Sequence, residues 1–109
     1  MQRFVKMLNL SENADDIAAY RDAHDHIWPE IVAGIKQVGI TAMDIYLLDN
    51  HAVMIMELPD EVNVEAAMTR LAALPLQAEW EEYVARFQQC NPGATSAEKW
   101  KPMECVFTL

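Results

Sequence analysis

Segments of distinct hydrophobic pattern follow one another along the first third of the chain. Residues 3–10 mix apolar with polar positions over the length of a strand, and Ser11 can then cap a helix. From residue 17 to residue 38, apolar side chains recur every three or four positions, which predicts one helix face. Pro29 lacks an amide hydrogen and disfavours helical geometry at Trp28. We therefore expect this helix to break between His24 and Pro29 and then to resume.

The rest of the chain continues with two strands, two helical stripes and a last strand. Residues 40–48 and 52–58 have strand character, and Asp and Asn between them favour a hairpin turn at 49–51. Pro75 separates two helical stripes, and the sequence at 90–93 ends the second. We place Trp100 in a loop and predict the final strand at 103–109. The two stripes consist of Val64, Ala67, Met68, Leu71 and Leu74, and of Trp80, Tyr83, Val84 and Phe87.

The order of elements, β-α-β-β-α-β with the second helical region split, predicts a ferredoxin-like α+β fold. We expect one domain that spans residues 1–109. In this fold the helices cover one face of the sheet, yet the run Val53 to Met56 is apolar at every position. A second copy that packs sheet against sheet would bury the other face and give a symmetric homodimer. The alternative is that loops of the same chain cover this face of the sheet.

Charge and composition narrow the classes of partner. The chain carries 17 acidic and 8 basic side chains and a net charge of −9, which repels nucleic acids and anionic membranes. Its two cysteines, Cys90 and Cys105, are too few for a disulfide framework and indicate reduced thiols. The sequence shows neither a signal-peptide pattern nor an apolar run long enough for a membrane span. We expect a cytoplasmic protein.

Tyr20 and His24 are the strongest candidates for chemistry. They are four residues apart, so on a helix both side chains project from one face. An imidazole can give or take a proton near neutral pH, and a phenol can orient a hydroxyl group. The alternative is that both belong to the hydrophobic core. His26 should lie on a different, exposed face, and His51 on the surface of the hairpin turn. Three dispersed histidines predict no metal site.

A second group of candidates could bind a sugar by stacking: the tryptophans Trp28, Trp80 and Trp100. The C–H face of a sugar ring packs on an indole while its hydroxyl groups seek polar neighbours. Taken singly, each tryptophan is more typical of the core than of a binding surface. The chain has no glycine-rich phosphate loop and none of the common nucleophile motifs, which argues against nucleotide binding and acyl transfer.

Five motifs follow one another along the chain: Tyr20-x-x-x-His24, Ile27-Trp28-Pro29-Glu30, Asp44-Ile45-Tyr46-Leu47, Trp80-x-x-Tyr83 and Asn91-Pro92. In this order they resemble the L-rhamnose mutarotase family through nearly the whole chain. The resemblance implies a small dimeric α/β-barrel enzyme, free of metal and cofactor, that interconverts the anomers of a monosaccharide. It also implies that His24 transfers protons and that Tyr20 contacts the substrate.

Two positions depart from the family pattern, and both are implied substrate contacts. Trp80-Glu81 stands where the family carries a pair of tryptophans, and Met43 aligns with a sugar-contacting tyrosine. We therefore expect substrate contacts from Met43, Trp80 and Glu81. The Glu81 carboxylate could either accept a hydrogen bond from a sugar hydroxyl or point to solvent. L-Fucose becomes a candidate substrate beside L-rhamnose. A cofactor-independent monooxygenase of the same architecture and a non-catalytic small-ligand-binding dimer remain alternatives.

Overall fold

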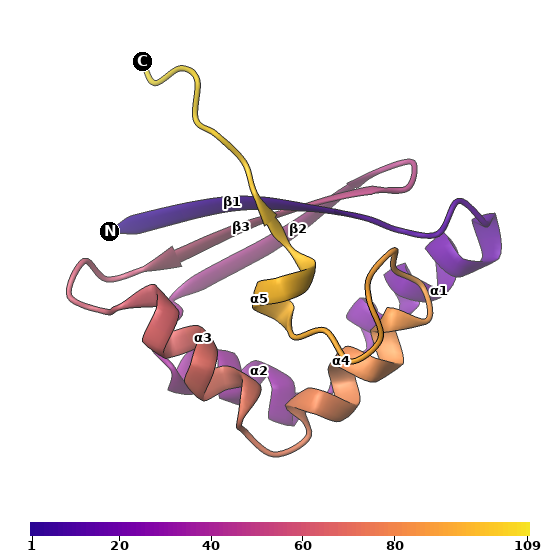
Figure 1. Cartoon of the computed structure of the whole chain (residues 1–109), viewed down its shortest axis with the longest axis horizontal. Helices are drawn as coiled ribbons and strands as arrows, with labels where there is room; N and C mark the ends of the chain where they lie inside the picture. Colours follow the sequence, from indigo (N-terminus) through magenta and orange to yellow (C-terminus); the bar gives the residue numbers. More distant parts are fainter.

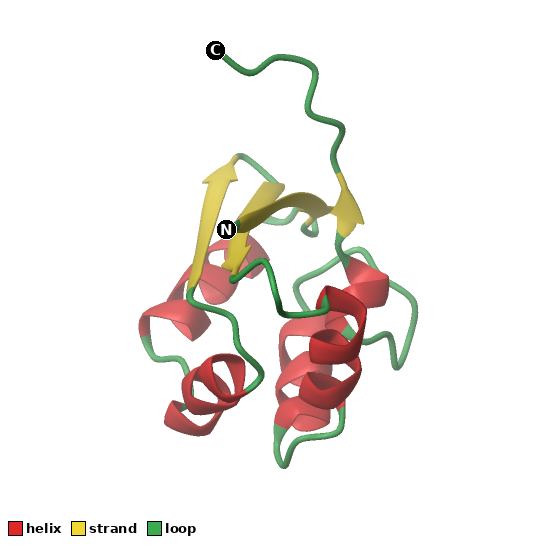
Figure 2. Ribbon diagram, turned by 90° about the vertical axis from the view of Figure 1, so that its left-hand side faces the viewer, coloured by secondary structure: helices red, strands yellow, loops and turns green.

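The computed structural model describes all 109 residues as a four-stranded sheet with helices on one side (Figure 1). Viewed from the side, the helices form a layer beneath the sheet, and the C-terminal segment leads away on the opposite side (Figure 2). The elements are β1 (Gln2–Asn9), α1 (Ala14–Asp25), α2 (Pro29–Gln37), β2 (Ala42–Leu48), β3 (His51–Leu58), α3 (Val64–Ala72), α4 (Gln77–Ala85), α5 (Ser96–Lys99) and β4 (Lys101–Pro102).

The sheet has the order β2-β3-β1-β4, and all its pairs are antiparallel. Met54 and Met56 of β3 face the helices and are buried, as is Leu8 of β1. Side chains of a strand alternate between faces, so Val53 and Ile55 lie on the outer face of the sheet. The ferredoxin-like α+β prediction is confirmed.

The break at Pro29 is confirmed. Helix α1 ends at Asp25, and Trp28 is the N-cap of α2 with extended backbone, ψ 131°. Pro29 then occupies the first turn of α2, where a missing amide hydrogen has no cost. The capping prediction was wrong by two residues. The Asn13 side chain, and not that of Ser11, accepts from the amides of Asp15 and Asp16.

The hairpin is confirmed, with a tighter turn than predicted. Asp49 has φ 53°, a left-handed conformation that Asp tolerates, and β3 already begins at His51. The two helical stripes form α3 and α4. Between them Leu76 also has a positive φ of 69° and caps α4 without a side-chain hydrogen bond. The sequence pattern did not predict α5, which Thr95 and Glu98 begin with a capping box.

The prediction of a final strand at 103–109 was wrong. β4 contains only Lys101 and Pro102, and the amide of Met103 makes one further bond, 2.8 Å long, to the carbonyl of Val5. Residues 104–109 leave the sheet and are exposed. Apolar residues alone indicated a strand there, but the segment leaves the sheet after Met103 and does not pair with the open edge of β1 at Gln2–Phe4.

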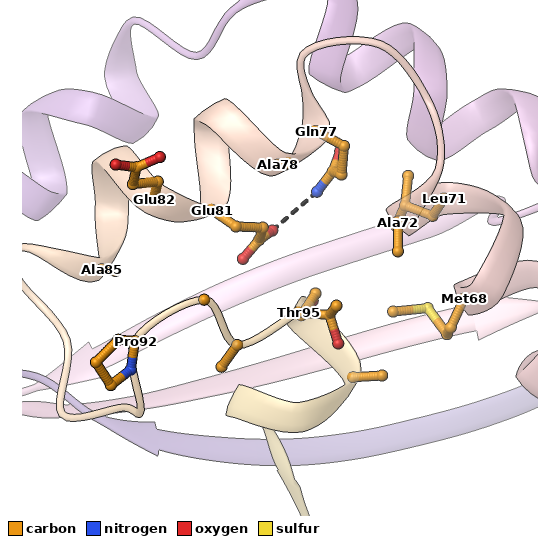
Figure 3. Close-up of a pocket in the computed structure, with 14 residues that line it drawn as sticks. Met68, Leu71, Ala72, Gln77, Ala78, Glu81, Glu82, Ala85, Pro92 and Thr95 are labelled. Carbon is orange, nitrogen blue, oxygen red and sulfur yellow. Dashed lines mark hydrogen bonds between the residues drawn. The ribbon is translucent and has the colours of Figure 1, made fainter.

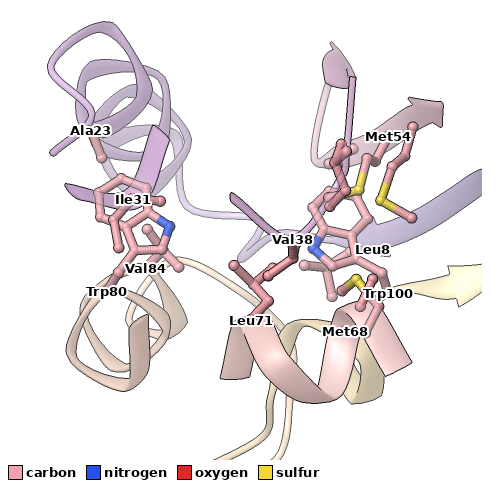
Figure 4. Packing of buried hydrophobic residues seen from close by; sticks show 14 of the residues in the cluster. Leu8, Ala23, Ile31, Val38, Met54, Met68, Leu71, Trp80, Val84 and Trp100 are labelled. Carbon is pink, nitrogen blue, oxygen red and sulfur yellow. The ribbon is translucent and has the colours of Figure 1, made fainter. Parts of the chain in front are cut away.

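The core fills the space between the sheet and the helices. Trp80 packs with Ala23, Ile31 and Val84, while Trp100 packs beside Leu8, Met54 and Met68 (Figure 4). Trp100 lies outside the helices and strands, directly after α5, and is buried. None of the helices combines the length and the apolar character that a membrane crossing would need.

Candidate active site between α1, β2 and α4

Helix α1 brings Tyr20 and His24 to one cavity, as the four-residue spacing predicts. Their ring centroids are 4.4 Å apart, and both side chains line a cavity of about 60 Å³ beneath the sheet. Met43 of β2 and Trp80 and Glu81 of α4 line the same cavity. The structure thus gathers all five residues singled out from the sequence. Their roles in binding or catalysis stay predictions.

The hydrogen bonding of His24 fixes its tautomer. Its Nδ1 lies 2.9 Å from the carbonyl oxygen of Tyr20, one helical turn earlier. A carbonyl oxygen can only accept, so Nδ1 carries the hydrogen and Nε2 carries a free lone pair. The imidazole ring also meets the Trp80 indole edge to face, with centroids 5.5 Å apart and an interplanar angle of 74°. His24 is therefore oriented and able to accept a proton at Nε2.

Tyr20 is a neutral phenol in the wall of the cavity. Burial raises the pKa of Tyr20 far above its ordinary value, the neighbouring Gln88 side chain lowers it in part, and the Glu81 charge raises it further. Only 2% of the residue is exposed. A phenol held in this state can donate a hydrogen bond but cannot serve as a base near neutral pH.

Sequence reasoning missed Gln88, which lies beyond the end of α4 and lines the same cavity. Its side-chain oxygen Oε1 is buried and has no hydrogen-bond partner in the protein. An unpaired buried acceptor favours a ligand that brings a donor, such as a hydroxyl group. No motif marked this residue, because a glutamine after a helical stripe is common on surfaces.

Glu81 takes part in a buried network instead of pointing to solvent, so the solvent alternative was wrong. Lys99 Nζ lies 3.0 Å from Glu81 Oε1 and 2.6 Å from the Glu81 carbonyl oxygen. Gln77 donates to Glu81 Oε2 at 2.8 Å (Figure 3). The exposed fractions of the Lys99 and Glu81 side chains are 1% and 13%. Each carboxylate oxygen is engaged, yet each keeps a lone pair for a further donor.

Trp28 and Tyr83 extend the aromatic wall behind Trp80. Trp28 meets Trp80 edge to face at 5.2 Å and stacks on Tyr83 at 5.8 Å with an interplanar angle of 16°. These contacts hold the Trp80 indole, of which 5% is exposed, against the cavity. The break before Pro29 places Trp28 here. The Ile27-Trp28-Pro29-Glu30 segment thus contributes Trp28 to the packing around the site.

Two larger hollows border the cavity and share lining residues with it. A groove of about 340 Å³ between α1, α2 and β2 shares His24, Ile27, Ile35, Met43 and Ile45 with it. A hollow of about 470 Å³ between α3, α4 and residues 92–97 shares Leu71, Gln77, Glu81 and Ser96 (Figure 3). Neither histidine nor tyrosine lines the larger hollow. We therefore place the candidate active site in the cavity and the adjoining groove. The cavity alone holds only a few water molecules.

His26 and His51 lie away from this site, as expected. His26 is 77% exposed and contacts Asp22, while His51 bonds to Asn9 on the surface of the hairpin. The structure brings together no three His, Cys, Asp or Glu side chains in a way that could hold a metal ion.

Comparison with known proteins identifies the family of this chain. The family model for L-rhamnose mutarotase matches residues 3–109. The L-fucose mutarotase of Xanthomonas campestris pv. campestris is 34% identical over 111 residues, covering 100% of this chain and 89% of that protein. The L-rhamnose mutarotase of Leptothrix cholodnii is 32% identical over 93 residues, covering 84% of this chain and 83% of that protein.

Solved structures share the fold. The L-rhamnose mutarotase from Formosa agariphila superposes with a TM-score of 0.77 at 21% identity, covering 100% of this chain and 99% of that one. Tetracenomycin F2 cyclase from Streptomyces glaucescens gives a TM-score of 0.59 at 17% identity, covering 100% of this chain and 99% of that one. The match of the family model over residues 3–109 shows that this chain belongs to the L-rhamnose mutarotase family.

Proposed function

We propose that this chain is a sugar mutarotase that interconverts the α and β anomers of a 6-deoxyhexose, L-rhamnose or L-fucose. The family match and the two named relatives support this activity. The observation that carries it is the fixed tautomer of His24, whose Nε2 is free to accept a proton in a side chain that lines the cavity. The relatives give no support to a monooxygenase or to a non-catalytic binding dimer.

Mutarotation requires two proton movements and no redox change. His24 Nε2 takes the proton from the anomeric hydroxyl while the bond between the anomeric carbon and the ring oxygen breaks. The ring oxygen receives a proton from a neighbouring hydroxyl or water, and the sugar becomes an open aldehyde. Rotation of the aldehyde and the reverse steps close the ring on the other face. Such positioned acid–base groups each contribute roughly 10²–10⁴-fold.

The remaining side chains of the cavity bind and orient the sugar in this proposal. Trp80 offers an apolar face, the neutral Tyr20 phenol donates a hydrogen bond, and Gln88 Oε1 accepts one from a sugar hydroxyl. Met43 lies at the junction of the cavity and the groove, where the sugar enters.

The two departures from the family pattern support L-fucose as the preferred substrate. Glu81, held by Lys99 and Gln77, presents a carboxylate where a stacking indole would bring apolar contact. A site built on polar contacts rejects sugars whose hydroxyls leave those groups unpaired. L-Fucose keeps the 6-methyl group of L-rhamnose while its hydroxyls differ in configuration.

A homodimer is the assembly that we propose for this enzyme. The outer face of the sheet carries apolar pairs, Val5 with Ile55 and Met7 with Val53, that no helix covers. A second copy that packs on this face would bury them. The solved structure of a dimeric ferredoxin-like protein from an uncultured marine organism shares this fold, with a TM-score of 0.57.

Saturation-transfer NMR of α/β exchange in L-fucose and L-rhamnose tests the activity directly. We expect the native protein to speed exchange, and His24→Ala to lose most of this effect. His26→Ala is a matched control, because His26 Nδ1 contacts the carbonyl of Asp22, four residues earlier, as His24 Nδ1 contacts Tyr20. Equal activity of the two variants would refute the role of His24. Oxygen consumption without anomer exchange would instead favour a monooxygenase.

A further inference from the structure

Lys6 of β1 lies on the helix side of the sheet without a partner for its charge. It pairs in register with Met54, whose side chain is buried against the helices, and paired residues of antiparallel strands share a face. Lys6 and Lys99 are the only Lys or Arg residues that are not exposed. Lys99 has Glu81 as its counter-charge, whereas none of the four ion pairs of the chain includes Lys6. Partial burial lowers the pKa of Lys6 below its ordinary value.

Lys6 lines a hollow of about 440 Å³ between β1, α3 and the start of α5. Helices α3 and α5 both lie beneath the sheet (Figure 1). The volume falls within the range of roughly 300–1,000 Å³ that is typical of small-molecule sites. The apolar part of the wall is aliphatic and contains no aromatic ring. It consists of Val64, Met68, Ala72 and Ala97. The hollow therefore suits a ligand with an aliphatic body.

The hydroxyl groups that line this hollow already have partners. The Thr69 hydroxyl donates to the Glu65 carbonyl oxygen at 2.9 Å, and the Thr95 hydroxyl donates to the Glu98 carboxylate at 3.0 Å. Glu65 also lines the hollow, but it is exposed and its carboxylate makes no ion pair with Lys6. A ligand therefore meets one free donor in this hollow, the Lys6 ammonium group.

The charges around the hollow favour a carboxylate over a phosphate. Phosphate sites typically combine arginine side chains or the backbone amides of a helix N-terminus, whereas this hollow offers a single ammonium group. Glu65 in its wall and the net charge of −9 repel a second negative charge on the ligand. A carboxylate carries one charge, which one ammonium group can balance.

The larger hollow between α3, α4 and residues 92–97 borders this one and adds space for an aliphatic chain. The two hollows share Met68, Ala72, Thr95 and Ala97, of which Met68, Ala72 and Thr95 are labelled in Figure 3. The carboxylates of Glu81 and Glu82 belong to the larger hollow. They repel an anion, so the charged end of a ligand belongs at Lys6 and its chain beside the shared residues.

We propose that these two hollows form a binding site for a medium-chain aliphatic carboxylate, with the carboxylate on Lys6 and the chain between α3 and α5. The ligand supplies the counter-charge that Lys6 lacks within the chain, and burial of each methylene group adds to the affinity. Neither His24 nor Tyr20 lines these hollows. The site is therefore distinct from the candidate active site and does not rest on the proposed function.

Titration of the isotope-labelled full-length chain with octanoate, followed by two-dimensional NMR without any sugar, tests this site. We expect saturable shifts of the backbone amides of α3 and α5. Lys6→Met removes the charge, keeps an aliphatic side chain and should raise the dissociation constant of octanoate about tenfold. Arg70→Met is the matched control, because it removes the same charge from an exposed residue of α3 outside the hollow and should leave the dissociation constant unchanged.

Two further probes separate the chain of the ligand from its charge. Lys6→Met should not weaken the binding of uncharged 1-octanol, and acetate should bind the native protein more weakly than octanoate because it buries no chain. Ala72→Phe fills the wall that the two hollows share, so it should abolish octanoate binding while Lys6 is intact. Unshifted amides in α3 and α5, equal octanoate affinity of Lys6→Met and the native protein, or phosphate that binds as tightly as octanoate would each overturn the proposal.

Discussion

The buried ion pair between Lys99 and Glu81 gives a prediction whose size can be worked out from the structure. Lys99→Met removes an ammonium group that makes bonds of 3.0 Å and 2.6 Å to the Glu81 carboxylate and carbonyl oxygens. It leaves a carboxylate that is 13% exposed and keeps one bond, from Gln77. Breaking a buried pair in this way destabilises proteins by about 3–5 kcal/mol.

We expect Lys99→Met to lower the free energy of unfolding by about 3 kcal/mol, the lower end of that range, because water and Gln77 still reach Glu81. This is a large share of the roughly 5–15 kcal/mol that stabilises a domain. Urea unfolding, followed by tryptophan fluorescence, measures the change. Lys101→Met is the matched control, since the Lys101 side chain is exposed and bonds only to the Glu98 carbonyl. This variant should change the free energy of unfolding by no more than about 0.5 kcal/mol.

A double-mutant cycle separates the charge from the packing. Replacing both partners, as in Lys99→Met with Glu81→Leu, removes the uncompensated charge and should recover most of the lost stability. Additive effects of the two substitutions would show that no coupling exists between them. A loss below about 1 kcal/mol for Lys99→Met would show that water already screens the pair. Either result would refute the reasoning from burial.

Two further predictions concern Tyr20 and Glu81. The pKa of Tyr20 is raised in the folded protein, so the fold keeps a proton that the unfolded chain loses near pH 10, and stability falls as the pH rises above that value. Urea unfolding should show about 1.4 kcal/mol less stability per pH unit there, and Tyr20→Phe should remove this part of the slope; an unchanged slope would contradict it. Glu81→Trp, made together with Lys99→Met to avoid a buried unpaired ammonium, should raise the ratio of L-rhamnose to L-fucose exchange in saturation-transfer NMR. A native enzyme that is faster on L-rhamnose, with an unchanged ratio in the variant, would show that Glu81 does not set the preference.

The sequence by itself determined those features that depend on neighbours along the chain. Pro29 acts on its own amide and on Trp28, so the end of α1 and the start of α2 could be predicted. Tyr20 and His24 share a face because they are four residues apart on a helix. The hairpin at Asp49 follows from local backbone preferences, and the order of strands and helices then restricts the fold to few topologies.

Only the tertiary structure decided which distant residues meet. Lys99 is 18 residues from Glu81, and no local pattern indicates that α5 brings its ammonium to that carboxylate. The unpaired Gln88 oxygen and the junction at Met43 likewise depend on how α1, β2 and α4 enclose one cavity. Residues 103–109 show the same limit of sequence reasoning. Their sequence favours a strand, but a strand forms only where it pairs with another backbone, and position in space determines whether it does.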